Sequence, residues 1–317
     1  MRPFRFVASV PRLGRTPGQW RDDVRRIEDL GFSAVSISDH LTAGWGMEAT
    51  VAMMAAADAT STLRVQSLVL ANDFRHPAVL HKALATIDVF SGGRLEIGLG
   101  TGWMASDYAS TGLSLDPAAE RSGRLEETVH ILKGLFGEPA FSFNGEHYRI
   151  AELEGLPKPV QHPHPPLLLG GGGKRILSLA AREADIVSVY PSLRAGRLTT
   201  DLAADLSPDR TAEQVQWVRD AASAAGRQPA DIELHLSLFM CNITTSAGQA
   251  QTYLSSQAAA LEADPSLLRT SPAVLAGSLE QCAEALLARR ERYGFSCIKL
   301  GADVVATAPL VALLAGT

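Results

Sequence analysis

The feature that most limits the fold of this chain is the alternation of short apolar runs with longer helical segments. The apolar runs are rich in β-branched residues, as strands buried on both faces of a parallel sheet are. In the first helical segment, residues 16–31, Trp20, Val24, Ile27 and Leu30 recur on one face. The predicted strands cover residues 4–10, 34–38, 64–72, 94–102, 167–173, 185–190, 231–240 and 295–301. Eight strand–helix repeats predict an α/β fold of the (β/α)8 TIM-barrel class.

A doubly wound open sheet is the main alternative. In such a sheet the functional residues gather at one switch point, whereas here polar residues and glycines mark strand ends in both halves of the sequence. We therefore expect a single TIM-barrel domain over residues 1–317, with insertions near 138–166 and 190–210. The first insertion contains a predicted hairpin at 141–150 that turns at an Asn-Gly pair.

Composition and charge exclude several functional classes. The chain has 29 basic and 34 acidic residues and a formal net charge of −5, so it offers no basic surface for nucleic acid. Its three cysteines include no Cys-x-x-Cys pair, which argues against a disulfide framework and fits a reducing compartment. No apolar run approaches the ~20 residues of a membrane span, and the N-terminal run is too short for a signal peptide. These patterns predict a cytoplasmic protein with a small-molecule substrate and no membrane partner.

The carboxyl ends of the predicted strands carry the candidate functional residues, because a TIM barrel places its active site there. Asp39 and His40 follow a buried strand, and a titratable pair in that place is typical of catalysis. A satisfied core histidine, with Asp39 capping the next turn, is the alternative. Trp103 either lines a cofactor plane or covers the barrel mouth. The other strand-end residues are Ser9, Leu70, Ala71, Asn72, Thr101, Gly102, Gly170 to Gly173 and Tyr190.

Two glycine patterns resemble nucleotide motifs without matching them. The run at 98–102 lacks the G-x-G-x-x-G spacing, and the run at 170–175 is not a Walker A loop because Arg175 follows Lys174. The second run still ends a predicted strand and begins a helix. Backbone N–H groups at a helix N-terminus bind phosphate, and the two basic side chains add positive charge. Four successive glycines exceed what a tight turn requires, so we favour a phosphate site over a purely structural turn.

The remaining polar groups are assigned structural roles. His162 and His164 lie in a proline-rich segment without carboxylate partners, so no metal site is predicted. Glu126 and Glu127 are expected on a helix surface, with Arg121 and Arg124 nearby for pairing.

Four segments of the chain together form a recognisable combination, namely IEDLGFSAVSISDH, FRHPAVLHKALATIDVFSGGRLEIGLGTGW, FNGEHYRI and PPLLLGGGG. They resemble the bacterial-luciferase-like superfamily of flavin- and deazaflavin-dependent oxidoreductases. The resemblance covers nearly the whole chain, and the superfamily has a TIM barrel with a hairpin inserted before strand five. The Ser-Asp-His motif makes the chain more similar to the branch that uses coenzyme F420, a 5-deazaflavin.

The resemblance implies roles for individual residues. Asp39 would touch the deazaflavin, and His40 would be the catalytic residue at the hydride-transfer face. The segment at 68–71 matches a bulged stretch, with a non-proline cis peptide in relatives, that backs the ring. The cofactor contacts implied are therefore Asp39, Val69, Leu70, Ala71, Thr101, Gly102, Gly171, Gly172, Gly173, Arg175 and Ile176. The substrate pocket is expected to be lined by Ser9, Trp45, Trp103 and Tyr190.

One departure from the pattern bears on the substrate. F420-dependent sugar-phosphate dehydrogenases have Glu directly after the Thr-Gly pair, where this chain has Trp103, so a more apolar substrate is expected. The resemblance implies hydride transfer between F420 and a C=C, C=N or carbonyl group. An FMN-dependent luciferase-like monooxygenase and a non-catalytic flavin-binding barrel are the alternatives. The sequence leaves open whether the chain forms a homodimer. Lys174, Arg175, Arg194 and Arg197 follow strands five and six, where they would meet the acidic tail of F420.

Overall fold

The structure is a computed structural model, and it describes residues 1–14, 16–42, 44–191 and 205–317. Arg194, Arg197 and the central part of the insertion expected at 190–210 lie outside the described residues. The chain forms two compact units. The first consists of Met1–Pro11, Arg26–Ala34 and Gly170–Thr317, and the second of Arg12–Arg25 and Val35–Leu169.

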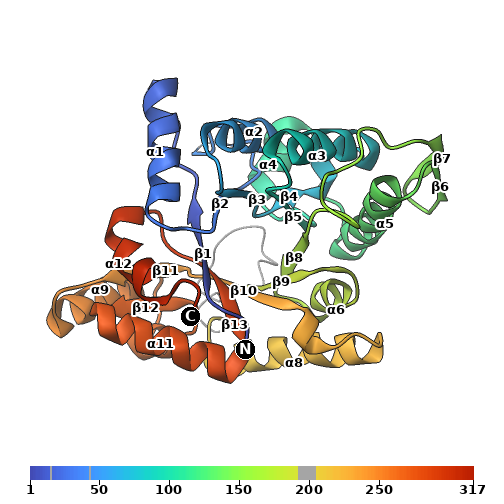
Figure 1. Cartoon of the computed structure of the whole chain (residues 1–317). Coiled ribbons are helices and arrows are strands. Elements are labelled where there is room, and N and C mark those ends of the chain that lie inside the picture. The colour runs from blue at the N-terminus through green and yellow to red at the C-terminus, as the bar shows by residue number, and fades with distance from the viewer. Residues whose placement is uncertain (15, 43, 192–204) are drawn as a thin grey trace. The chain divides into compact units, whose positions relative to one another are not determined.

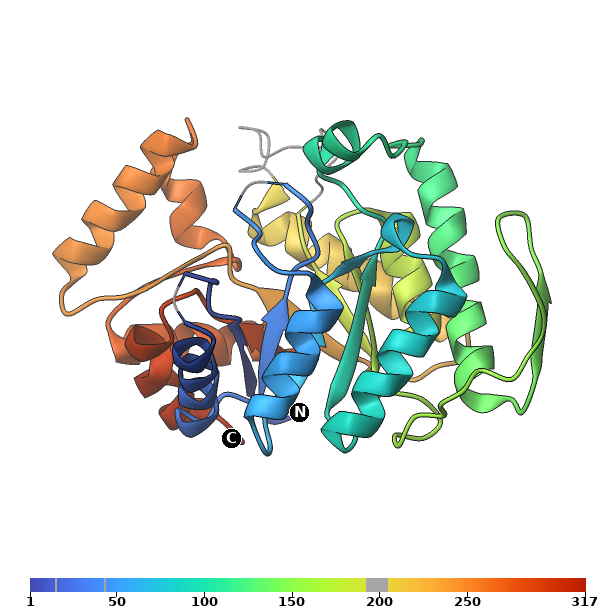
Figure 2. The same ribbon diagram turned by 90° about the horizontal axis from the view of Figure 1, so that it is seen from above.

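The second unit is built around one fully buried strand. This strand, β5, pairs in parallel with β3, β4 and β8, and helices α2 and α3 pack side by side (Figures 1 and 2). The strands are β2 (Ala34–Ile37), β3 (Arg64–Ser67), β4 (Leu70–Ala71), β5 (Leu95–Gly100), β6 (Phe141–Asn144), β7 (Arg149–Leu153) and the beginning of β8 (Leu167–Gly171). The helices are most of α1 (Pro17–Asp29), then α2 (Ala49–Ala59), η1 (Asn72–Phe74), α3 (Pro77–Ser91), α4 (Ala105–Thr111) and α5 (Ala118–Gly137).

The strand predicted at 64–72 is two strands, β3 and β4, separated by Leu68 and Val69. The peptide bond between these two residues is cis, which confirms the expectation drawn from the resemblance. Two glycines of β5 allow the segment between β3 and β4 to lie close to β5. A Cβ atom at Gly98 would collide with the Ser67 carbonyl, and one at Gly100 would press on Val69 at 2.6 Å. The glycines at 98–102 therefore serve close packing of the backbone.

The hairpin β6–β7 is present, but its turn differs from the prediction. The two strands are joined by four residues, 145–148, and not by an Asn-Gly pair. The Glu127 carboxylate accepts hydrogen bonds from the backbone N–H groups of Glu146 (2.7 Å) and Tyr148 (3.0 Å). The longer loop is therefore fixed by a helix side chain, and the expectation that Glu127 pairs with Arg121 and Arg124 on the helix surface is wrong.

The first unit holds a second group of parallel strands, in which β1, β13, β10 and β9 pair in that order. The strands are β1 (Arg5–Ser9), β9 (Ile186–Val189), β10 (Glu233–Ser237), β11 (Met240–Ile243), β12 (Val274–Gly277) and β13 (Phe295–Lys299). The helices are α6 (Lys174–Glu183), α8 (Pro208–Ala224), η2 (Pro229–Asp231), α9 (Ala247–Ala260), α10 (Pro265–Thr270), α11 (Leu279–Tyr293) and α12 (Val304–Leu314). The two ends of the chain meet here, because the Phe4 N–H donates to the Thr317 carbonyl (3.1 Å).

The strand predicted at 231–240 is also divided. Its first part is β10, and Met240 begins β11, which pairs only with β12 in a separate two-stranded sheet (Figure 1). A small apolar cluster that includes Met240, Leu254 and Leu268 covers this sheet. The pairing of β11 with β12 divides the run, because the two partners are more than thirty residues apart and local pattern does not reveal it.

The fold class follows from the parallel strands taken together. They belong to one sheet in the order β3-β2-β1-β13-β10-β9-β8-β5-β4, and an additional pairing of β3 with β5 closes it. With β3 and β4 counted as one interrupted strand, this is the eight-stranded (β/α)8 TIM barrel that the alternation predicts. Among the described helices, none combines the length and apolar character that a membrane span requires.

Candidate active site

A histidine–aspartate pair lies beyond the carboxyl end of β2 in the second unit. The His40 Nδ1 atom is 2.7 Å from the Asp107 Oδ2 atom. The Asp107 side chain is almost fully buried, and that of His40 is 12% exposed. The other carboxylate oxygen of Asp107 accepts hydrogen bonds from the backbone N–H groups of Leu41 (3.0 Å) and Thr42 (3.0 Å) and from the Thr42 hydroxyl (2.8 Å). Four donors therefore converge on one carboxylate.

These bonds determine the protonation of the pair. Burial raises the pKa of Asp107, but the hydrogen bonds from His40, Thr42 and Leu41 outweigh it and lower the pKa below its ordinary value of 3.8. Asp107 is therefore ionised at neutral pH and can only accept, so His40 Nδ1 carries the proton of the shared bond. The Nε2 atom has no hydrogen-bond partner among the described residues. This nitrogen is the one left to exchange a proton with a substrate.

Two tryptophans surround the His40 ring. The Trp45 ring lies with its centroid 4.6 Å from that of His40, and Trp103 approaches at 5.8 Å with its plane at 89° to the imidazole. Trp45 is 45% exposed, and Trp103 is half-buried. The structure thus brings together three residues that the sequence singled out, and it surrounds the imidazole with apolar surface.

Asp39 has a structural role beside this pair. Its carboxylate is buried, forms a two-point ion pair with Arg75 (2.6 and 3.0 Å) and accepts the Ala71 N–H (3.0 Å). Arg75 also bonds Glu48. Both oxygens of Asp39 are therefore engaged, and they tie the end of β2 to the end of β4. Leu70 and Ala71 are buried, whereas Val69 is half-buried.

A second network of hydrogen bonds fixes the residues that follow the end of β5. Gly102 has a φ of 74°, and a Cβ atom there would collide with the Tyr108 hydroxyl, so glycine is required. That hydroxyl donates to Asp73 (3.1 Å). Arg121 donates to the carbonyls of Thr101 (3.3 Å) and Gly102. These bonds fix the position of Thr101 and Gly102 at the strand end.

Asn72 directly follows β4, and its hydrogen bonds show whether a flavin-type ring would fit at this strand end. Its side chain is buried, its Nδ2 donates to the Tyr148 hydroxyl (3.4 Å), and its Oδ1 has no partner among the described residues. A buried acceptor without a donor is costly. The pyrimidine edge of FMN or F420 carries an N–H donor that could satisfy it. The free acceptor of Asn72 at this strand end therefore fits such a ring.

The predicted phosphate residues belong to the first unit. Strand β8 ends at Gly171, and α6 begins at Lys174 with Gly173 as its N-cap and no side-chain cap. Among the described residues no side chain caps the first N–H groups of α6, and Lys174 and Arg175 are exposed. This geometry suits an anion.

Other predicted residues of the first unit lie around the same turn. Ile176 packs on Gly171, and a Cβ atom added at that glycine would lie 3.0 Å from it. Gly172 is buried, and its carbonyl accepts from Gln214 (3.0 Å). The half-buried Tyr190 donates its N–H to the Gly171 carbonyl (3.2 Å). Ser9, the last residue of β1, is half-buried.

Sequence reasoning missed two polar residues. Asp107 lies in the first turn of α4, the helix that follows the end of β5, and an acidic residue in that place was the available signal. Lys299 is the last residue of β13, and burial lowers its pKa. A lysine at the end of an apolar strand was visible in the sequence, and a barrel directs that end toward its active face.

Comparisons with known proteins show which family and fold the chain resembles. A family model described as luciferase-like monooxygenase matches residues 7–297. The chain is 34% identical over 202 residues to the FMNH(2)-dependent dimethylsulfone monooxygenase of Pseudomonas putida, which covers 58% of this chain and 55% of that protein. It is 29% identical over 186 residues to the F420-dependent glucose-6-phosphate dehydrogenase of Amycolatopsis mediterranei, with 57% and 55% covered. The chain thus spans about half the length of the curated relatives it matches.

Solved structures show the same fold. An F420-dependent secondary alcohol dehydrogenase in complex with an F420-acetone adduct aligns with a TM-score of 0.78 at 16% identity, covering 98% of both chains. The monooxygenase RslO1 of Streptomyces bottropensis aligns with a TM-score of 0.75 at 23% identity, covering 98% of this chain and 97% of that one. At these identities the likeness concerns the fold alone.

Proposed function

The chain belongs to the luciferase-like monooxygenase family, and we propose that it transfers a hydride between coenzyme F420 and a small organic substrate with a C=C, C=N or carbonyl group. One observation carries the proposal. The His40 imidazole is oriented by a buried, ionised Asp107 and flanked by two indole rings at the carboxyl end of a barrel strand. Apolar walls and one oriented proton donor are what hydride transfer to an uncharged group requires of a protein.

Different residues of the second unit would have different roles in this reaction. When bound, the deazaflavin supplies the hydride chemistry. His40 gives or takes the accompanying proton at Nε2, because its Nδ1–H is committed to Asp107. Trp45 and Trp103 exclude water from that nitrogen and offer flat apolar surface to the substrate. Val69, Leu70 and Ala71 would back the ring, and Asn72 Oδ1 would accept from its N–H edge.

The runner-up is an FMN-dependent monooxygenase, and the likeness to the dimethylsulfone monooxygenase favours it. The Ser-Asp-His motif and the apolar setting of His40 favour F420. A sugar-phosphate substrate is not proposed, although one relative is a glucose-6-phosphate dehydrogenase. Trp103 lies edge-on to the His40 imidazole, at the sequence position where those enzymes have a glutamate. An indole provides no charged group for a sugar-phosphate substrate. A non-catalytic flavin-binding barrel would bind the cofactor and show no turnover.

We expect F420 to bind at least ten times more tightly than FMN, with a salt dependence that FMN lacks. The two cofactors share a ring, a ribityl chain and a phosphate, but only F420 continues into a tail with several carboxylates. Lys174 and Arg175 are exposed at the start of α6 and would meet that tail. Each exposed contact is worth ~0–1 kcal/mol and is screened by salt. Isothermal titration of both cofactors at two salt concentrations measures the difference.

A matched variant sharpens this titration. Lys174→Ala/Arg175→Ala should reduce the salt dependence of F420 binding and leave FMN affinity nearly unchanged. Tighter binding of FMN than of F420, or FMN that remains bound through purification, would reject the F420 assignment in favour of the monooxygenase.

Gly173→Asp is expected to weaken cofactor binding at least tenfold without lowering the melting temperature. A Cβ atom at Gly173 would meet none of the described residues within 4 Å, and aspartate is a favoured helix N-cap, so α6 tolerates the change. The new carboxylate would occupy the N–H groups proposed for the cofactor phosphate and repel it. Gly173→Ala is the control, because it adds the Cβ atom without charge. Equal affinities of the two variants would mean that the glycine turn is structural.

A further inference from the structure

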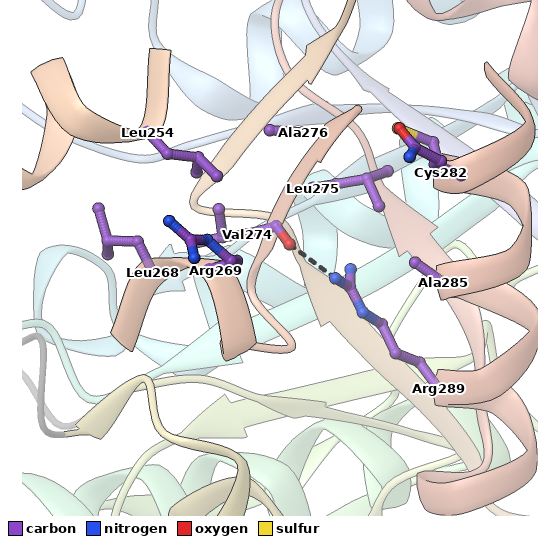
Figure 3. Close-up of a pocket in the computed structure, with 10 residues that line it drawn as sticks. Leu254, Leu268, Arg269, Val274, Leu275, Ala276, Cys282, Ala285 and Arg289 are labelled. Atoms are coloured by element: carbon purple, nitrogen blue, oxygen red, sulfur yellow. Dashed lines mark hydrogen bonds between the residues drawn. The ribbon is translucent and has the colours of Figure 1, made fainter. Parts of the chain in front are cut away.

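A pocket of about 100 Å³ lies within the first unit. It is formed by α9, α10, β12 and α11 (Figure 3). Most of its wall is apolar, with Leu254, Leu268 and Leu275 among the lining residues. Three of its polar groups are Arg289, Cys282 and, on an exposed position of α10, Arg269. An apolar pocket with a few convergent polar groups is the usual form of a small-ligand site.

The Arg289 guanidinium is only partly satisfied. Its Nη2 donates to the carbonyl of Val274 (2.6 Å), the bond drawn in Figure 3, and approaches that of Ser271 at 3.5 Å. Its Nη1 is buried and has no partner among the described residues. A guanidinium has five N–H donors, so the carbonyls leave several of them free. The pocket therefore presents unused donors to whatever enters it.

The positive charge of Arg289 is also not neutralised. Burial lowers its pKa to about 10, so it remains cationic at neutral pH. Burial raises the pKa of Cys282 to about 11 and also raises that of Cys241, so both nearby thiols are neutral. No carboxylate among the described residues forms an ion pair with Arg289. A buried charge without a counter-ion is costly, and an anion in the pocket would remove that cost.

We propose that this pocket binds a small organic carboxylate of the size of acetate or propionate. The carboxylate would accept from Arg289 Nη1, and the short chain would lie against the leucines of the wall. An apolar cavity of about 150 Å³ holds benzene, so this pocket suits a ligand somewhat smaller. Arg269, bonded to Gln251 through Nη2 (2.9 Å), adds positive charge from an exposed position. The proposal does not depend on the redox function.

Saturation-transfer NMR with propionate tests the site directly. The wild-type protein and Arg292→Met should both show saturation of the propionate signals at millimolar concentrations. Arg292 is the matched control, because it is exposed on the same helix three residues further on. Arg289→Met should reduce the signal at least tenfold. We expect this variant to fold, because it removes a desolvated charge that has no counter-ion among the described residues and puts an apolar side chain in its place.

The neutral isostere 1-propanol separates anion recognition from simple apolar filling, and this comparison uses only the wild-type protein. Propionate should give saturation that sodium chloride at equal ionic strength does not suppress, whereas propanol should give at least tenfold less. Equal saturation by propanol, displacement by chloride, or a propionate signal unchanged in Arg289→Met would each overturn the proposal. Absence of any propionate signal in the wild-type protein up to about 50 mM would do so as well.

Discussion

Replacing His40 by alanine is expected to reduce turnover about 10²–10⁴-fold while leaving cofactor affinity within a factor of about two. General acid–base catalysis contributes rate factors of this size, which correspond to about 3–5 kcal/mol of transition-state stabilisation. Cofactor affinity should persist, because His40 is not among the residues proposed to hold the ring or the phosphate. The measurement pairs cofactor titration with the oxidation of reduced F420 in the presence of a panel of C=C, C=N and carbonyl compounds.

His130→Ala is the control for this experiment. His130 is exposed on α5 and packs near Phe141 and Phe143, far along the chain from the proposed site. It should retain wild-type turnover. A His40→Ala variant with unchanged turnover over the whole pH range would remove His40 from the mechanism, and a variant that loses cofactor binding as well would make it a binding residue.

Replacing Asp107 by asparagine is expected to reduce turnover about 10²-fold with little change in cofactor affinity. Asp107 acts through His40 and is a positioning residue. The carboxylate makes Nδ1 the protonated nitrogen, and the amide of asparagine does not impose that choice. A small misplacement of a reacting group is sufficient for a loss of this size. Nitrogen-15 NMR of the His40 ring should show one tautomer in the wild-type protein and a mixture in Asp107→Asn.

A double-mutant cycle decides whether Asp107 works through His40. His40→Ala/Asp107→Asn should be no slower than His40→Ala alone, because the two residues act as a unit. Asp58→Asn, at an exposed position of α2, is the matched control and should change neither rate nor tautomer. If the losses of the two single variants multiply in the double variant, or if the His40 tautomer is unchanged in Asp107→Asn, Asp107 acts by another route.

The lowered pKa of Asp107 also predicts how the stability of the folded chain changes at acid pH. Its pKa is lower in the folded chain than its ordinary value of 3.8, so the stabilisation from its bonds is present above that value. It is lost as pH falls through the lower, folded pKa. The pair is therefore intact throughout the neutral range in which the rate measurements are made.

Local pattern was sufficient for the barrel but not for its irregularities. The apolar runs and helical periodicity gave eight strand–helix repeats, because buried parallel strands must be apolar on both faces. The interruption at Leu68 and the separate β11–β12 sheet were not visible in the pattern. Both depend on partners distant in the chain. The four-residue turn of the hairpin likewise depends on Glu127, which precedes it by about twenty residues.

The sequence by itself determined which residues stand at strand ends, since strand limits and the side chains that follow them are local properties. Strand ends thereby singled out His40, Trp103 and the glycine turn as candidates. The tertiary structure alone decided what these residues do to one another. It brought Asp107 from α4 to His40 over a separation of 67 residues, and it engaged Asp39 with Arg75 across 36. A carboxylate's role depends on the donors around it, and folding brings those donors together from distant parts of the chain.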